Sequence, residues 1–185
     1  MPPDRSSPMM APVRRLLKGA LSAMQLNQTV DPLAIGLPAP DFQLCDQHGR
    51  LRSLSEWRGQ WLVLYFYPKD DTPGCTAEAC NFRDDWQQIT ALGAQVVGIS
   101  VDTSASHKAF AEKHHLPFTL LADVSGDVAR AYGALSDWKL FKFARRYTFV
   151  IDPQGRLSKS YLSVRASTHS AGVIADLRQL GAHQA

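Results

Sequence analysis

Apolar residues along this chain gather in short runs, separated by stretches in which apolar positions follow a helical spacing. Continuous apolar runs predict buried strands at three places: residues 61–67, 94–101 and 116–121. Alternating positions around turns predict two antiparallel hairpins: residues 39–46 with 51–54, and residues 146–152 with 156–162. Strands therefore recur along most of the chain.

Helical spacing fills the gaps between these strands. It predicts four helices: residues 76–92, 104–115, 125–133 and 171–180. Ser104, Ser125 and Thr168 lie where three of these helices would begin, and hydroxyl side chains favour that position. The order is a hairpin, alternating strands and helices, a second hairpin and a last helix. We expect an α/β fold with a mixed central sheet covered by helices on both faces.

The composition is that of an ordinary globular protein, with 45% hydrophobic and 20% charged residues among 185. The formal charge of +3 is too small to indicate nucleic-acid binding, and no apolar run is long enough to cross a bilayer. Three cysteines in such a chain are typical of a reducing compartment rather than of a disulfide-rich secreted scaffold. We expect a cytoplasmic protein that binds neither nucleic acid nor membrane.

The N-terminal part differs in character from the rest. We expect residues 1–35 to be a partly disordered extension and residues 36–182 to form one domain. Residues 13–24 can form a short basic amphipathic helix. This helix is either a loosely packed extension, which we favour, or a targeting segment, although Lys18 and Gly19 interrupt the apolar stretch that a signal peptide needs.

One cysteine lies where a strand gives way to a helix. Cys75 follows the strand predicted at 61–67 and a turn rich in proline, glycine and aspartate. Backbone N–H groups at a helix start are unpaired and lie at the positive end of the dipole, so a thiol there is biased toward the reactive thiolate. Cys80 follows at a longer spacing than in the Cys-x-x-Cys pair of a disulfide exchanger. The pattern predicts a redox enzyme.

These residues carry a resemblance to a known family. Pro68, Thr72 and Cys75 match the Pro-x-x-x-Thr-x-x-Cys motif of the peroxiredoxins, and Thr-Pro-Gly-Cys-Thr-x-x-x-Cys resembles the atypical two-cysteine group called bacterioferritin comigratory protein or peroxiredoxin Q. The similarity runs from about residue 36 to residue 180. It includes further segments in the order of the family: residues 39–42, 66–68, 81–84, 97–102, 107–110, 116–118 and 146–149.

The resemblance implies a thioredoxin-like fold with an N-terminal β-hairpin, and an antioxidant activity. A protein of this group is a peroxidase that reduces hydrogen peroxide and organic hydroperoxides, and thioredoxin or a similar dithiol recycles it. The chemistry needs no cofactor and no metal.

The same resemblance assigns the site residues: Cys75 as peroxidatic cysteine, Cys80 as resolving cysteine, and Thr72, Arg146 and Pro68 as supporting residues. Attack of the Cys75 thiolate on a peroxide oxygen gives a sulfenic acid plus water or alcohol. Thr72 and Arg146 can stabilise the developing negative charge, and Pro68 can shield the sulfur from water. Since neighbouring strand residues point to opposite faces, only one of Arg145 and Arg146 can reach the sulfur. The Arg-x-Thr-Phe pattern of the family favours Arg146.

Cys75 and Cys80 cannot form a disulfide while both lie in one intact helix. Residues five apart in a helix have Cα atoms about 8.7 Å apart and point about 140° away from each other, whereas a disulfide needs Cα atoms within about 7 Å. We expect residues 75–82 to unwind after the sulfenic acid forms, which leaves an exposed and easily reduced disulfide. Because both cysteines belong to one chain, we expect a monomer.

The segment directly before the arginine has two interpretations. Residues 138–146 place four basic residues among three aromatic ones, with less glycine than the family pattern. Leu140, Phe141 and Phe143 can form an apolar lip that accepts organic hydroperoxides. Alternatively the segment is a helix or loop packed on the core, which we favour because aromatic residues at such spacing commonly lie in the core.

The remaining cysteine and the histidines are weaker candidates for functional residues. Cys45 is either a second resolving thiol or, as we favour, a small and partly buried apolar residue. His107 and His114 are about two helical turns apart and share a face, but no cysteine pair has the spacing of a zinc site. We expect no metal site and solvated surface histidines, His169 included.

Three functions are compatible with this pattern of residues. The favoured function is a thioredoxin-dependent peroxidase. The alternative is a peroxide-responsive redox sensor or holdase, which shares Cys75 but is oxidised once per event. A disulfide oxidoreductase fits less well, because the chain lacks Cys-x-x-Cys and has Thr72 and Arg146.

Overall fold

The structure, a computed structural model, describes residues 33–138 and 141–182. The candidate helix at 13–24, nearly all of the predicted extension and Leu140 lie outside these residues. Seven strands form the central sheet: β1 (Gln43–Asp46), β2 (Leu51–Ser53), β3 (Trp61–Phe66), β4 (Ala94–Ser100), β5 (Thr119–Ala122), β8 (Tyr147–Ile151) and β9 (Leu157–Tyr161). The helices are α1 (Pro73–Asp84), α2 (Trp86–Ala91), α3 (Ser104–His114), α4 (Asp127–Ala131), α5 (His169–Gln179) and the short 3-10 helix η1 (Leu54–Trp57).

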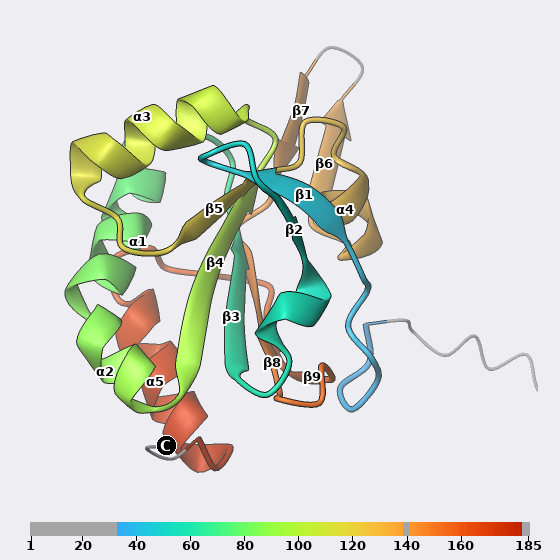
Figure 1. The fold of residues 1–185 in the computed structure, drawn as a ribbon, viewed down its shortest axis with the longest axis vertical. Helices are drawn as coiled ribbons and strands as arrows, with labels where there is room; N and C mark the ends of the chain where they lie inside the picture. Colours follow the sequence, from blue (N-terminus) through green and yellow to red (C-terminus); the bar gives the residue numbers. More distant parts are fainter. Residues whose placement is uncertain (1–32, 139–140, 183–185) are drawn as a thin grey trace, which may run out of the picture. The chain divides into compact units, whose positions relative to one another are not determined.

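The sheet is mixed, with the strand order β2-β1-β5-β4-β3-β8-β9 (Figure 1). β3, β4 and β5 are parallel, whereas β8 runs antiparallel to β3 and β9 antiparallel to β8. The N-terminal hairpin β1–β2 pairs antiparallel with β5. The α/β class with a mixed central sheet and an N-terminal hairpin is therefore confirmed.

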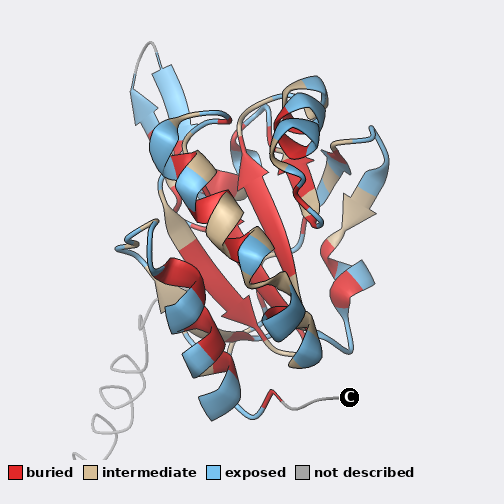
Figure 2. Cartoon of the chain, turned by 90° about the vertical axis from the view of Figure 1, so that its left-hand side faces the viewer, coloured by how far each residue is buried: buried red, intermediate tan, exposed pale blue. Residues whose placement is uncertain are grey.

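Helices cover both faces of the sheet, but unequally. Crossovers between parallel strands are nearly always right-handed, and β3, β4 and β5 advance in one direction, so α1, α2 and α3 lie on the same face. α5 joins them there, since its apolar residues belong to the same buried cluster. α4 and η1 pack on the opposite face. Figure 2 looks onto the larger helical layer, with the buried strands behind it.

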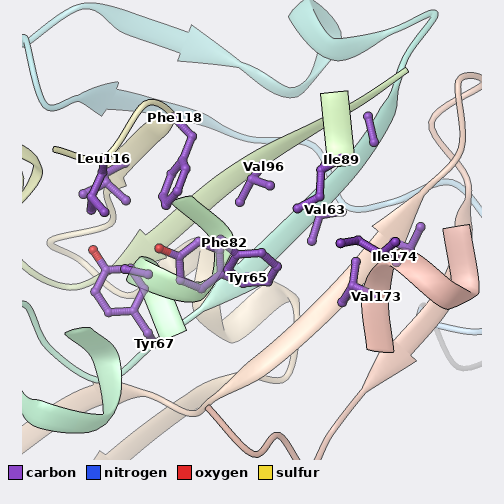
Figure 3. Packing of buried hydrophobic residues seen from close by; sticks show 14 of the residues in the cluster. Val63, Tyr65, Tyr67, Phe82, Ile89, Val96, Leu116, Phe118, Val173 and Ile174 are labelled. Atoms are coloured by element: carbon purple, nitrogen blue, oxygen red, sulfur yellow. The ribbon is translucent and has the colours of Figure 1, made fainter. Parts of the chain in front are cut away.

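The alternation of β3 divides the core into two halves. Val63 and Tyr65, and Tyr67 directly after the strand, face α1, α2, α3 and α5, and Tyr65 packs there against Phe82 and Phe118 (Figure 3). The intervening residues Leu62, Leu64 and Phe66 are buried on the other face. A strand buried on both faces reads as a continuous apolar run, which is the pattern that the sequence shows.

The segment 138–146 differs from the favoured expectation. It contributes to a separate two-stranded hairpin, β6 (Leu135–Trp138) with β7 (Phe141–Ala144), rather than to a helix or loop packed on the core. Trp138 lies opposite Phe141, and Asp137 lies opposite Lys142. Cross-strand aromatic and opposite-charge pairs of this kind stabilise a hairpin. Trp138 and Phe141 are 72% and 74% exposed, so the expectation of core packing is wrong for them.

Several helix boundaries also differ from the predicted ones. The helix predicted at 76–92 is two helices, which meet at Asp85. α3 is capped by Thr103 rather than by Ser104, because the Thr103 hydroxyl accepts from the Ser106 N–H. Within the described residues, no helix is long and apolar enough to cross a membrane.

Candidate active site

Cys75 is the third residue of α1, directly behind the loop that leaves β3. Thr72 occupies the N-cap position, and Thr76 N donates to Thr72 O at 2.8 Å. The N–H groups of Gly74 and Cys75 precede this first helical bond, and Pro73 has none. The sulfur therefore lies at the positive end of the helix dipole, although Cys75 is only 1% exposed.

Arg146 reaches the sulfur from the neighbouring strand. β8 runs antiparallel to β3 with Tyr147 opposite Phe66, so Arg146 lies beside the end of β3, where the loop toward α1 begins. Its Nη2 donates to Cys75 Sγ at 3.2 Å. Arg145 turns elsewhere, since its Nη1 donates to Tyr147 Oη at 3.4 Å. The structure thus brings Cys75 and Arg146 together, as expected from the sequence.

Glu78 is a member of this site that the sequence analysis missed. Its side chain is fully buried, and its Oε2 accepts a hydrogen bond from Arg146 Nη1. Burial raises the pKa of Glu78 from 4.5 to about 7, and the Arg146 guanidinium opposes that rise. The signal was present in the sequence, because Glu78 lies three residues after Cys75 and therefore on the same helix face.

The Arg146 guanidinium is thus shared between a carboxylate and a sulfur. Burial acts to lower the pKa of Arg146, but Glu78 and Cys75 together raise it. The arginine remains a cation, with one nitrogen on each acceptor. Such a fixed donor beside the sulfur suits a reaction in which negative charge develops there.

The other predicted site residues lie nearby but make different contacts. The Thr72 hydroxyl donates to Lys69 O at 3.1 Å rather than to the sulfur. Pro68 is half-buried and lines a groove together with Lys69. Cys80 is partly exposed, and its thiol is free like that of Cys75. Because α1 is continuous from Pro73 to Asp84, the two sulfurs cannot bond in this conformation.

The groove has a volume of about 490 Å³. Its lining residues come from the loop after β3, the turn after β4 and strand β7: Pro68, Lys69, Val101, Asp102, Phe141, Lys142 and Phe143. Phe141 and Phe143 are 74% and 38% exposed, so they offer apolar surface to a ligand. Phe141 and Phe143 are two of the three residues predicted to form an apolar lip, and the binding of organic hydroperoxides there stays a prediction.

Three expectations about individual side chains are wrong. His107 and His169 are 0% and 7% exposed, so they are core residues rather than solvated ones. His169 Nε2 lies 2.8 Å from Thr148 Oγ1, and burial lowers its pKa from 6.5 to about 4. Cys45 is exposed, because its neighbour Leu44 packs on the core instead. The described residues hold no group of three or more potential metal ligands.

The chain is similar to known proteins in sequence and in fold. The sequence matches the AhpC/TSA family over residues 35–160. It is 43% identical over 155 residues to peroxiredoxin Bcp of Bacillus subtilis, covering 80% of this chain and 97% of that protein. The structure of peroxidoxin BcpB from Mycobacterium tuberculosis aligns with a TM-score of 0.76 at 35% identity, covering 80% of this chain and 98% of that chain.

A second solved structure, of the Xanthomonas campestris bacterioferritin comigratory protein, was determined to study its alkyl peroxide reduction. It aligns with a TM-score of 0.71 at 30% identity, over 75% of this chain and 91% of that chain.

Proposed function

Because the chain belongs to the AhpC/TSA family, among relatives named bacterioferritin comigratory protein and peroxiredoxin Q, it is a thiol-dependent peroxidase, and we propose that Cys75 is its peroxidatic cysteine. The observation that carries this assignment is the 3.2 Å contact between Arg146 Nη2 and the buried Cys75 Sγ at the start of α1. A helix N-terminus and a guanidinium both place positive charge beside the sulfur at which negative charge develops.

In the proposed first step, the Cys75 thiolate attacks one oxygen of a hydroperoxide ROOH. The O–O bond breaks as the S–O bond forms, which leaves a sulfenic acid and an alkoxide that takes up a proton. Arg146 stabilises the charge that spreads over sulfur and oxygen, and Glu78 holds the guanidinium in place. The Thr72 hydroxyl lies at the N-cap and can turn from Lys69 O toward the peroxide.

In the proposed second step, Cys80 attacks the Cys75 sulfenic acid and displaces water, which gives an intramolecular disulfide. The first turns of α1 must unwind for this, because an intact helix keeps the two sulfurs apart. A dithiol such as thioredoxin then reduces the exposed disulfide. A resolving cysteine in the same chain is consistent with a monomer.

Coupled turnover tests this proposal. The native protein and the Cys75→Ser and Cys80→Ser variants are compared for peroxide-dependent NADPH consumption through thioredoxin and its reductase. We expect multiple turnover that Cys75→Ser abolishes and Cys80→Ser impairs, while Cys45→Ser serves as the matched control and retains activity. Turnover that survives Cys75→Ser would refute the assignment, and a single oxidation of Cys75 without turnover would favour a sensor.

Hydrogen exchange tests the unwinding separately. We expect amides at residues 75–82 to lose protection in the oxidised protein, whereas those of α3 and β4 stay protected. Equal protection of this segment in the reduced and oxidised proteins would show that the disulfide forms in another way.

We also propose that the groove beside Pro68 receives the organic part of alkyl hydroperoxides. Phe141 and Phe143 supply exposed apolar surface on its wall. The Xanthomonas campestris relative, whose structural study concerns alkyl peroxide reduction, supports this substrate class by similarity.

A further inference from the structure

Two consecutive aspartates end the loop that leads from β3 to α1, and helix α3 holds both of them. Asp70 and Asp71 directly precede Thr72. Asp70 contacts the first turn of α3 and Asp71 contacts its last turn. The loop that carries Pro68 and Thr72 is thus attached to a helix outside the segment expected to unwind.

Asp70 is buried in a network of hydrogen bonds. It is 7% exposed, and its Oδ2 accepts from Ser106 Oγ at 2.7 Å and lies 2.9 Å from His107 Nδ1. Its Oδ1 accepts from Tyr67 Oη at 2.8 Å. The Asp70 N–H donates to Asp102 Oδ2 at 2.9 Å, which ties the backbone to the turn after β4. Both carboxylate oxygens and the amide of Asp70 therefore have partners.

His107 connects Asp70 to strand β5 of the sheet. Its Nε2 lies 3.0 Å from the Leu121 carbonyl oxygen, which can only accept, so Nε2 carries a proton. Its Nδ1 lies 2.9 Å from Asp70 Oδ2 and 3.3 Å from Tyr67 Oη, so both ring nitrogens have polar partners. With both ring nitrogens bonded and the side chain fully buried, His107 fixes Asp70 against β5.

Asp71 is held at the surface. Its φ is 59°, a left-handed conformation that is uncommon for residues other than glycine. Its two carboxylate oxygens pair with Lys113 Nζ at 2.7 Å and His114 Nε2 at 2.9 Å. Exposed pairs of this kind are individually weak, but they lie on the same helix that holds Asp70.

We propose that Asp70 and Asp71 are positioning residues, which α3 holds so that Pro68 and Thr72 keep their place beside Cys75 through each cycle. The inference rests on the proposed function, in which residues 75–82 unwind. That unwinding breaks the bond from Thr76 N to Thr72 O, which links the loop to α1. The bonds from the aspartates to α3 do not involve the unwinding segment, so the loop stays in place and α1 can refold on it.

The two half-reactions separate this role from a merely structural one. In a ping-pong mechanism, kcat/KM for peroxide reports only on the reduced enzyme, and kcat/KM for thioredoxin reports only on the disulfide form. For Asp70→Ala we expect kcat/KM for hydrogen peroxide to fall about 10- to 100-fold, because misplacement of catalytic groups by about 1 Å costs that much. We expect kcat/KM for thioredoxin to change less than about twofold, since the exposed disulfide does not use the loop.

Two comparison variants sharpen the test. The amide in Asp70→Asn can still accept from Tyr67, and its two N–H groups can donate to His107 Nδ1 and Ser106 Oγ, so we expect its kcat/KM for peroxide to stay within about threefold of the native value. Asp123→Ala is the matched control. Asp123 is likewise buried, at 1% exposure, but it accepts from Ala129 N at 2.7 Å at the start of α4. We expect it to lower stability and leave both kcat/KM values unchanged.

The outcomes are distinct. Equal loss in both half-reactions, or no loss for peroxide, would overturn the inference. If Asp70→Ala fails to fold, Ser106→Ala provides a milder test, because it removes only one hydrogen bond to Asp70. We expect this variant to lower kcat/KM for hydrogen peroxide about two- to fivefold and to leave kcat/KM for thioredoxin unchanged. No loss for peroxide would again overturn the inference. A native protein without turnover would remove the proposed function itself, whereas native turnover with unaffected variants would refute only the positioning role.

Discussion

The buried carboxylate of Glu78 makes the stability of this protein depend on pH in a defined direction. Its pKa is about 7 in the folded protein, compared with an ordinary value of 4.5, because burial disfavours the charged form. At pH values between 4.5 and about 7, the folded state therefore binds more protons at Glu78 than the unfolded state does. The contribution of Glu78 to the free energy of unfolding therefore falls as the pH rises through this window and levels off above pH 7.

The magnitude follows from the same two values. Since a tenfold change in a protonation equilibrium is worth about 1.4 kcal/mol, the difference between 4.5 and about 7 amounts to about 3 kcal/mol. The Glu78→Gln variant keeps an oxygen that can accept from Arg146 but has no proton to lose. We expect the variant to gain about 3 kcal/mol relative to the native protein when the pH is raised from 4.5 to 8.

Urea unfolding of both proteins at several pH values, under reducing conditions, measures this difference. Glu112→Gln provides the control, because the Glu112 side chain on α3 is 67% exposed and its removal should leave the pH dependence unchanged. Unfolding free energies that run parallel for the native protein and Glu78→Gln across the whole range would refute the reasoning.

Three further predictions concern the site and its surroundings. Arg146→Lys keeps the positive charge but loses the guanidinium fork that spans two acceptors. We expect the rate of Cys75 oxidation by hydrogen peroxide to fall about 100-fold in this variant, as measured by stopped flow. An unchanged rate would contradict the role of the guanidinium. Phe141→Ala combined with Phe143→Ala should lower the ratio of alkyl to hydrogen peroxide kcat/KM about tenfold through lost apolar contact, and a constant ratio would exclude the groove as a binding site. Burial lowers the pKa of His169 from 6.5 to about 4, so the contribution of His169 to stability, measured as the difference between the native protein and His169→Asn, should fall by about 3 kcal/mol as the pH falls across that window. Acid unfolding curves of both proteins measure this difference.

Much of the fold could be predicted because its signals are local. The apolar run at β3, buried on both faces, and the turn residues before Cys75 place the cysteine at a strand-to-helix junction without any knowledge of the rest of the chain. The β6–β7 hairpin could not be predicted in this way. Its pairs Asp137–Lys142 and Trp138–Phe141 exist only once the two strands meet, and the isolated segment reads equally well as core.

The histidines show the same limit of prediction from local sequence. Helical spacing correctly places His107 and His114 on one face of α3, but spacing does not reveal what that face meets. In the structure the face meets the loop before α1, where His107 is buried against Asp70 and His114 pairs with Asp71. Packing between elements distant in sequence decided that these are anchored side chains rather than solvated ones.

The sequence by itself determined the local chemistry of this protein: a thiol at a helix start and a second thiol that an intact helix keeps out of reach. Propensity, capping and turn preferences act over a few residues, so they can be read directly from the chain. Only the tertiary structure decided which groups surround that thiol. The antiparallel pairing of β8 with β3 brings Arg146 to Cys75, and the packing of α1 on the sheet buries Glu78 and raises its pKa. Burial and charge pairing depend on neighbours that topology supplies, and no single stretch of sequence contains them.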